Sequence, residues 1–301
     1  MHHDPRLYGE ERSRWTLNGF RRACAWLHIA TPAGIWGLLH RLDIRLKRAR
    51  EHVHSPDLDY ILKVRCVQVC FHRSLRSPEA AVVLFQDEMA YYRQPAVSTA
   101  YEQRGSAQAL AERSWRANSA WRIVATLNAF TGQVIYHQGS HISIPTLVGF
   151  YQTVCDTYRG QGTIYMVQDN WPIHFHPDVL AALEPQWLPW PSHVPGHWRE
   201  TPRRTAQHLN LPIQLIALPA YAPWTNPIEK LWRWLRQDVL HLHRYADLWD
   251  DLKRRVGAFL DGFRQGSAEL LRYVGLTANS HLYGEFFQGR SAPPHITGLN
   301  C

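Results

Sequence analysis

Two apolar runs with matching ends constrain the fold of this chain more than any other feature. Residues 81–85 read Ala-Val-Val-Leu-Phe, and residues 164–167 read Ile-Tyr-Met-Val. Both are typical of strands buried on both faces of a sheet. Each run continues into Gln-Asp, at Asp87 and at Asp169. An Asp at the carboxyl end of a central α/β strand lies at the sheet edge where ligands bind, so neighbouring strands would point both carboxylates into one cleft.

Two charged carboxylates in one cleft, here those of Asp87 and Asp169, repel each other. At ~4 Å they repel by about 4 kcal/mol at an effective dielectric constant of 20. Either one acid keeps a proton or a divalent cation binds both. The alternative is that each Asp only caps the loop or helix that follows it. The repeated context of Asp87 and Asp169 favours the shared cleft, whereas Glu88 alternates to the opposite strand face and is left outside the ligand set.

A third acid opens a predicted long helix. Asn226-Pro227-Ile228-Glu229 is a capping-box pattern, in which Glu229 bonds back to the Asn226 backbone. However, Glu229 also lies about 100° from Ile228, at the rim of the helix face that is predicted to be buried. From the rim a carboxylate can lean over the sheet edge. Spacing alone leaves both roles open.

The other segments predict a mixed α/β domain. Residues 122–127 and 133–137 flank Thr131-Gly132 as a hairpin, a helix begins at Pro145, and residues 212–218 form a further strand. Residues 185–210 are rich in Pro, Trp and His, so they cannot run as a regular helix or central strand. They are predicted to be either a flap anchored by tryptophans that lays its arginines along substrate DNA or a partner subunit, or a surface insertion without a role.

Positive charge is concentrated in the first fifty residues. The net charge of the chain is +8, and residues 1–50 hold ten Lys/Arg against four Asp/Glu. Leu17, Phe20, Cys24 and Leu27 form one helical stripe, and Thr31-Pro32 starts a second helix with an apolar face of Ile35, Leu38, Leu39 and Leu42. The pattern suits a helix-turn-helix that binds DNA, although any small helical hairpin has it. The predicted phosphate contacts are Arg41, Arg45, Lys47, Arg48 and Arg50.

Residues 218–232 carry a longer pattern, Leu-Pro-Ala-Tyr-Ala-Pro-Trp-Thr-Asn-Pro-Ile-Glu-Lys-Leu-Trp. It resembles the third catalytic motif of DDE transposases of the mariner superfamily, in their bacterial insertion-sequence branch. Asp87-Glu88 and Asp169-Asn170 resemble the first and second motifs, in the same order. The resemblance covers roughly residues 15–265. It includes His174, Arg104-Gly105, and Ser55-Pro56-Asp57 at the end of the DNA-binding region. At Tyr101, four residues before Gly105, the family usually has Trp.

The resemblance implies a ribonuclease-H-like catalytic core, a mixed central sheet flanked by helices, preceded by a small all-α helix-turn-helix segment. It implies that Asp87 and Asp169 bridge two Mg²⁺ (or Mn²⁺) ions and that Glu229 completes a ligand set. Supporting roles are implied for Asn170, His174 and Asn226. The implied partners are double-stranded DNA, as terminal inverted repeats and target, and a second copy of the chain in a homodimer.

The expected domain division follows from these segments. Residues 1–54 are the DNA-binding segment, which is incomplete if the family's usual upstream helix-turn-helix is absent. Residues 55–80 are expected to be a linker with one helix, residues 81–265 the catalytic domain, and residues 266–301 a C-terminal tail. Asp169 and Glu229 are separated by 59 residues, more than is usual in the family, and the excess falls in the insertion at 185–210.

Other functions stay open on the sequence alone. A transposase descendant that binds DNA without cutting it would need no catalytic acids, and a structure-selective nuclease on the same fold would need no helix-turn-helix. A zinc site at His174/His176 or at His241/His243 lacks a third ligand at a suitable spacing. The five cysteines show no CxxC pair, so neither a disulfide framework nor a Cys-based zinc site is expected. No apolar run approaches the ~20 residues of a membrane span, and a cytoplasmic protein is expected.

Overall fold

The computed structural model describes residues 4–11, 14–46, 55–105, 108–192 and 194–277. The chain divides into two compact units, residues 1–52 and residues 53–301, which are described separately. Among the described residues, none of the helices combines the length and the apolar character that crossing a bilayer requires.

The first unit is built on the predicted pair of short helices. After a 3₁₀ turn, η1 (Pro5–Tyr8), come α1 (Leu17–Ala23), a second 3₁₀ turn, η2 (Ala25–Leu27), and α2 (Pro32–Arg41). The Thr31 hydroxyl accepts the Gly34 N–H at 3.1 Å, which confirms the predicted cap of the second helix. Ile35 is buried on α2, but Leu42 follows the helix end and is 60 % exposed, so the predicted apolar face stops at Leu39.

The second unit is organised by a mixed sheet of five strands in the order β3-β2-β1-β4-β5. On one side, β1 pairs antiparallel with β2, and β2 and β3 form the predicted hairpin. On the other side, β1 pairs parallel with β4, and β4 pairs parallel with β5. The two apolar runs of the sequence are therefore neighbouring central strands, as expected. The strands are β1 (Ala81–Tyr92), β2 (Ala120–Asn128), β3 (Val134–Gly139), β4 (Thr163–Gln168) and β5 (Ile213–Ala217).

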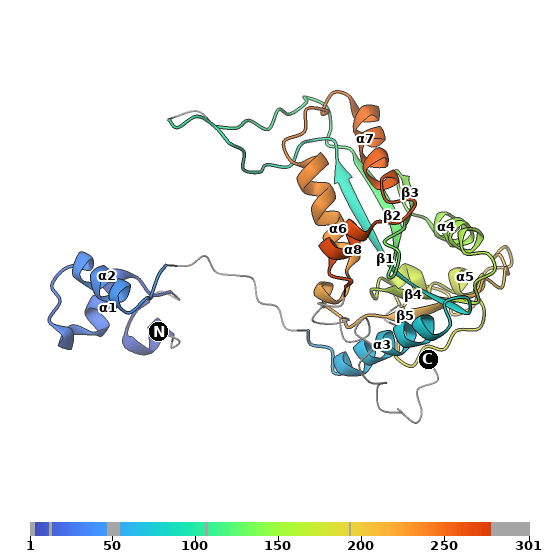
Figure 1. Cartoon of the computed structure of the whole chain (residues 1–301), viewed down its shortest axis with the longest axis horizontal. Coiled ribbons are helices and arrows are strands. Elements are labelled where there is room, and N and C mark those ends of the chain that lie inside the picture. The colour runs from blue at the N-terminus through green and yellow to red at the C-terminus, as the bar shows by residue number, and fades with distance from the viewer. Residues whose placement is uncertain (1–3, 12–13, 47–54, 106–107, 193, 278–301) are drawn as a thin grey trace. The chain divides into compact units, whose positions relative to one another are not determined.

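Helices cover both faces of this sheet (Figure 1). One face of β1, with Val82 and Leu84, packs with α4 (Ile144–Thr157) and α5 (Pro177–Leu180). The opposite face, with Val83 and Phe85, packs with α3, α6, α7 and α8. Because successive strand residues point to opposite faces, the uninterrupted apolar run satisfies two cores at once. The helices of the second face are α3 (Tyr60–Arg76), α6 (Ile228–Leu235), α7 (Trp249–Asp261) and α8 (Ala268–Val274).

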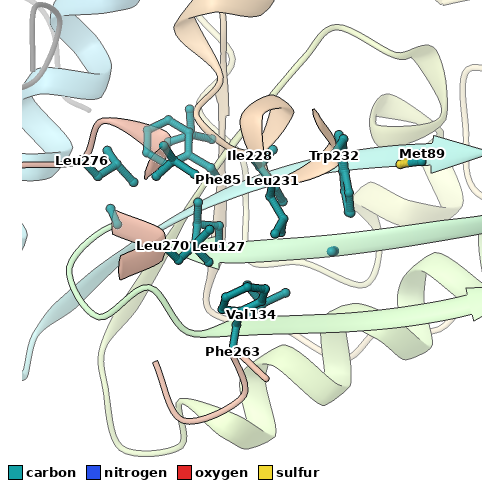
Figure 2. Close-up of a cluster of buried hydrophobic side chains, with 14 of the residues drawn as sticks. Phe85, Met89, Leu127, Val134, Ile228, Leu231, Trp232, Phe263, Leu270 and Leu276 are labelled. Carbon is teal, nitrogen blue, oxygen red and sulfur yellow. The ribbon is translucent and has the colours of Figure 1, made fainter. Parts of the chain in front are cut away.

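Figure 2 shows the second core, in which side chains of α6 meet β1, β2 and the C-terminal helices. Ile228, Leu231, Trp232 and Leu235 are buried there, as the predicted stripe requires. A single π-helical turn (Arg236–Leu240) follows α6 and keeps Val239 in the same core.

The segments expected to be a linker and a C-terminal tail both pack in the core of the second unit. Residues 55–80 were expected to be a linker, yet Cys66, Val67, Cys70 and Phe71 of α3 are buried in the core of the second unit. The expected tail from residue 266 begins with α8, whose residues pack on α6. The Lys230 ammonium donates to the Val274 carbonyl at 2.8 Å and ties the two helices together. Both segments are amphipathic helices, and a sheet face needs such helices to exclude water.

The described part of the insertion at 185–210 contains neither helix nor strand, as predicted. It is nevertheless held against the second unit. The Gln186 side-chain oxygen accepts the Leu215 N–H at 2.9 Å. The Trp190 ring packs against the core, and Lys63 Nζ lies over it, 5.5 Å from the ring centroid. Further along, Trp198 packs edge-on against His176, and the Arg203 N–H donates to Asp178 at 2.7 Å.

Candidate active site

The structure brings the three predicted acids to one cleft of about 650 Å³. Phe85 and Val167 are paired in the parallel register of β1 and β4, and Asp87 and Asp169 each lie two residues further on. Both acids therefore stand at the carboxyl edge of β4. Glu229 reaches the same cleft from the first turn of α6.

Asp87 is the most buried of the three acids, with 9 % of its surface exposed. Its Oδ2 accepts the indole N–H of Trp232 at 2.8 Å. Burial, followed by the charges of Glu229 and Glu88, raises the pKa of Asp87 to about 8, although the bonds from the Trp232 indole and the Glu88 backbone act to lower it. Without a cation, Asp87 therefore holds a proton at neutral pH.

The pKa values of Asp169 and Glu229 are also raised, in both cases mainly by burial. Asp169 Oδ1 accepts the Trp171 N–H at 2.9 Å, so this acid does cap the following turn, the alternative role considered for it. The capping box at Glu229 does not form, because α6 starts after Pro227 without any side-chain cap. The Glu229 carboxylate is thus left to the cleft.

Two amides join the three motifs around the cleft. Asn170 donates to the Leu218 carbonyl at 2.9 Å and connects the second motif to the third. Asn226 donates to the Gln86 carbonyl at 3.1 Å and connects the third motif to the first. Both asparagines were predicted as supporting residues. Asn226 bonds to the residue before Asp87, and Asn170 bonds to Leu218, which lines the cleft.

Ser55 and Asp57 anchor the loop that lines the cleft, through its residue Ala220. The resemblance had placed these two residues at the end of the DNA-binding region. The Ser55 hydroxyl donates to the Ala220 carbonyl at 2.5 Å, and the Ala220 N–H donates to Asp57 at 2.7 Å. Asp57 also accepts from Lys63 at 2.8 Å. Although burial acts to raise it, the pKa of Asp57 is lowered by these bonds. A pairing across more than 160 residues leaves no local signal in the sequence.

His174 and Glu88 meet on the other side of Asp169. The His174 ring is fully buried, and its Nε2 lies 3.6 Å from Glu88 Oε2 and 3.7 Å from Asp169 Oδ1. Glu88 does lie on the opposite strand face from Asp87, where the Gln86 amide donates to it at 3.0 Å. Glu88 was predicted to lie outside the ligand set because of this alternation. However, Asp169 follows the end of β4, and ligand atoms of Glu88 and His174 lie within 4.8 Å of one of its oxygens.

The predicted phosphate contacts belong to the first unit. Arg41 ends α2 and is exposed, and Arg45 is exposed and pairs with Asp43 at 3.1 Å. Lys47, Arg48 and Arg50 lie outside the described residues. Arg199, Arg203 and Arg204 of the insertion are all exposed, and Arg203 is paired with Asp178 at 3.5 Å.

The chain is similar to known proteins in sequence and in fold. The family model described as DDE superfamily endonuclease matches residues 82–253. An insertion element IS630 uncharacterized 39 kDa protein from Shigella sonnei is 23% identical over 263 residues, which cover 84% of this chain. The chain spans 66% of the length of that relative.

Solved structures of Mos1 mariner transposase complexes share the fold. The paired-end complex with Mn has a TM-score of 0.59 at 14% identity, and the complex with the left transposon end has 0.56 at 13% identity. Each similarity covers 94% of this chain and 75% of the other. The predicted ribonuclease-H-like core is confirmed.

Proposed function

Because the chain belongs to the DDE superfamily endonucleases, we propose that it is a DNA transposase that cuts and joins strands with divalent ions held by Asp87, Asp169 and Glu229. The observation that carries this proposal is the convergence of the three carboxylates on one cleft. Asp87 reaches it from within β1, Asp169 from just past the end of β4, and Glu229 from the first turn of α6. Three acids whose pKa values are all raised form a site that a cation completes.

The donor set fits hard cations. Carboxylate oxygens suit Mg²⁺ and Mn²⁺, and a paired-end complex of the structural relative Mos1 is known with each of these metals. We propose that two such ions bind here and that Asp87, Asp169 and Glu229 would hold them. When bound, such ions activate the attacking oxygen and stabilise the leaving oxygen in an in-line displacement.

The surrounding residues hold these acids in place. Trp232 donates to one oxygen of Asp87 and leaves the other oxygen free of that bond. Asn170 and Asn226 fix the loop and helix start that carry Glu229 relative to the strands. Such pre-organisation of charged ligands is what metal-assisted phosphoryl transfer requires of the protein.

The proposed substrate is double-stranded DNA, both the terminal inverted repeats of an insertion element and its target. Arg41, Arg45, Lys47, Arg48 and Arg50 are proposed to contact phosphates. The Mos1 relatives are paired-end complexes, and a homodimer of this chain on two DNA ends is proposed by analogy. A silent DNA-binding descendant is the weaker candidate, because the acids and the amides that position them are all in place.

The test is cleavage of a DNA duplex that carries the inverted repeats flanking the gene. We expect the full chain to cut it with Mg²⁺ or Mn²⁺ and not with a chelator. Asp87→Asn and Asp169→Asn should each lower the rate at least about 1,000-fold, or about 4 kcal/mol in the barrier. Asp156→Asn, an exposed acid paired with Arg159 on the surface, is the matched control. Metal-independent cutting, or full activity in both cleft variants, would refute the proposal.

A further inference from the structure

Glu88 and Asp169 border a second cavity beside the main cleft, and the buried His174 ring lies against both of them. One ligand atom from each residue lies within 4.8 Å of the others. The cavity measures about 300 Å³, and its lining includes Asp87, Glu88 and Asp169, together with Arg122 and Trp171. Asp87 and Asp169 thus border both cavities, Glu229 only the first and Glu88 only the second.

His174 presents a bare nitrogen to Glu88 and Asp169. Its side chain is 1% exposed, and Nε2 has no hydrogen-bond partner. The Tyr151 hydroxyl donates to Gln168 at 3.3 Å, and its oxygen lies 3.4 Å from His174 Nδ1. Nδ1 therefore carries the proton and donates to Tyr151, which leaves the Nε2 lone pair directed at two carboxylates. A buried lone pair that faces two carboxylates is repelled by both, and a cation between the three groups, either a proton or a metal ion, removes that repulsion.

We propose that Glu88, Asp169 and His174 bind a divalent ion of their own, Mn²⁺ in preference to Mg²⁺, at a site that shares the Asp169 carboxylate with the catalytic acids. The inference rests on the proposed function through Asp169, which belongs to both ligand sets. Its role is to hold the Asp169 carboxylate from the side of the sheet that Glu229 does not reach.

The geometry and the donor types fit such an ion. Two ligand atoms that are each about 2.1 Å from one ion lie about 3.0 Å apart at right angles and about 4.2 Å apart when opposite. The separations of 3.6 and 3.7 Å from His174 Nε2 fall inside that range. An imidazole nitrogen favours transition ions, whereas Mg²⁺ prefers oxygen ligands only. A ligating His that donates its other N–H to a fixed acceptor is the usual arrangement in metal sites.

Pulsed electron paramagnetic resonance on the wild-type full chain with Mn²⁺ tests the site directly. We expect a ¹⁴N coupling to the bound ion, replaced by a ¹⁵N coupling when histidine alone is ¹⁵N-labelled. This readout needs neither a variant nor catalysis. Bound Mn²⁺ without any nitrogen coupling would overturn the inference and leave the proposed catalytic acids intact.

Variants then assign the ligands. Glu88→Gln and His174→Gln should each weaken one Mn²⁺ equivalent at least about tenfold, and His174→Gln should remove the nitrogen coupling. The matched control is His137→Gln, an exposed histidine on β3. Asp87→Asn should keep the nitrogen coupling. A coupling that survives in His174→Gln, or a Glu88→Gln variant with unchanged Mn²⁺ affinity, would contradict the assignment.

Discussion

At the scale of single residues, burial of Asp87 favours its neutral form, whereas its proposed function as a metal ligand requires the charged form. Its carboxyl group is placed in the core between Trp232 and the acids of the cleft, and this raises its pKa to about 8. In the unfolded chain the same group ionises near pH 4. The folded, metal-free protein therefore binds a proton that the unfolded chain has released, and its stability falls as the pH rises from about 4 to about 8.

Asp87→Asn removes this buried charge and keeps a side chain of the same shape that can still accept from Trp232. With a chelator at pH 8.5, we expect urea unfolding to show a gain of about 1–2 kcal/mol. The gain should vanish below about pH 3, where Asp87 is protonated in both states. Asp156→Asn, on an exposed acid, serves as the control. Equal stability of wild type and Asp87→Asn at pH 8.5 would show that the carboxyl is not strained by its surroundings.

At the scale of elements, α6 connects packing to chemistry. Its buried stripe fixes the helix against the sheet, its first turn carries Glu229 to the cleft, and Trp232 bonds to Asp87 one turn later. Lys230 joins the helix to α8. The position of Glu229 is thus set by hydrophobic contacts on the other side of its own helix, and not by a local cap.

The two basic segments can be compared by one measurement. Arg41→Ala/Arg45→Ala removes two exposed charges from the first unit, and Arg199→Ala/Arg204→Ala removes two from the insertion. Since each phosphate contact contributes about −0.9 to the slope of log K against log salt, each pair that contacts DNA should make the slope shallower by about 2.

Arg159→Ala/Arg264→Ala is the control, because these two exposed arginines belong to neither basic segment. A slope that does not change in the Arg41/Arg45 variant would move the DNA-binding surface away from the tail of α2. A slope that does not change in the Arg199/Arg204 variant would leave the insertion without a DNA contact, as a surface addition anchored by Trp190.

At the scale of the whole molecule, the core reaches well beyond the expected catalytic domain, from α3 to Leu276. The strands that carry Asp87 and Asp169 could be predicted, because uninterrupted apolar runs are specific to central strands. α3 and α8 were read as linker and tail, because an amphipathic helix does not reveal the sheet face on which it packs. Ser55 and Asp57 were misplaced for a similar reason, since their partner Ala220 is remote in sequence.

The same limit applies to the candidate site. The order of Asp87, Asp169 and Glu229 along the chain, together with their motifs, predicted which acids share a cleft. Strand alternation correctly separated Glu88 from Asp87. It could not show that Asp169, just past the end of β4, is reached from both faces, or that the buried His174 lies beside it. Contacts at a strand end depend on the following loop, which periodicity does not describe.

The central claim is that these carboxylates act as charged metal ligands in DNA cleavage, and Glu229→Gln tests it most directly. The amide keeps the size and helix position of the side chain and removes only its charge, and no helix-capping bond is lost because none is formed. In a single-turnover assay with Mn²⁺ on DNA bearing the terminal repeats, we predict a rate at least about 1,000-fold lower than wild type, with DNA affinity and thermal stability retained. A Glu229→Gln protein that cuts at the wild-type rate would contradict the account.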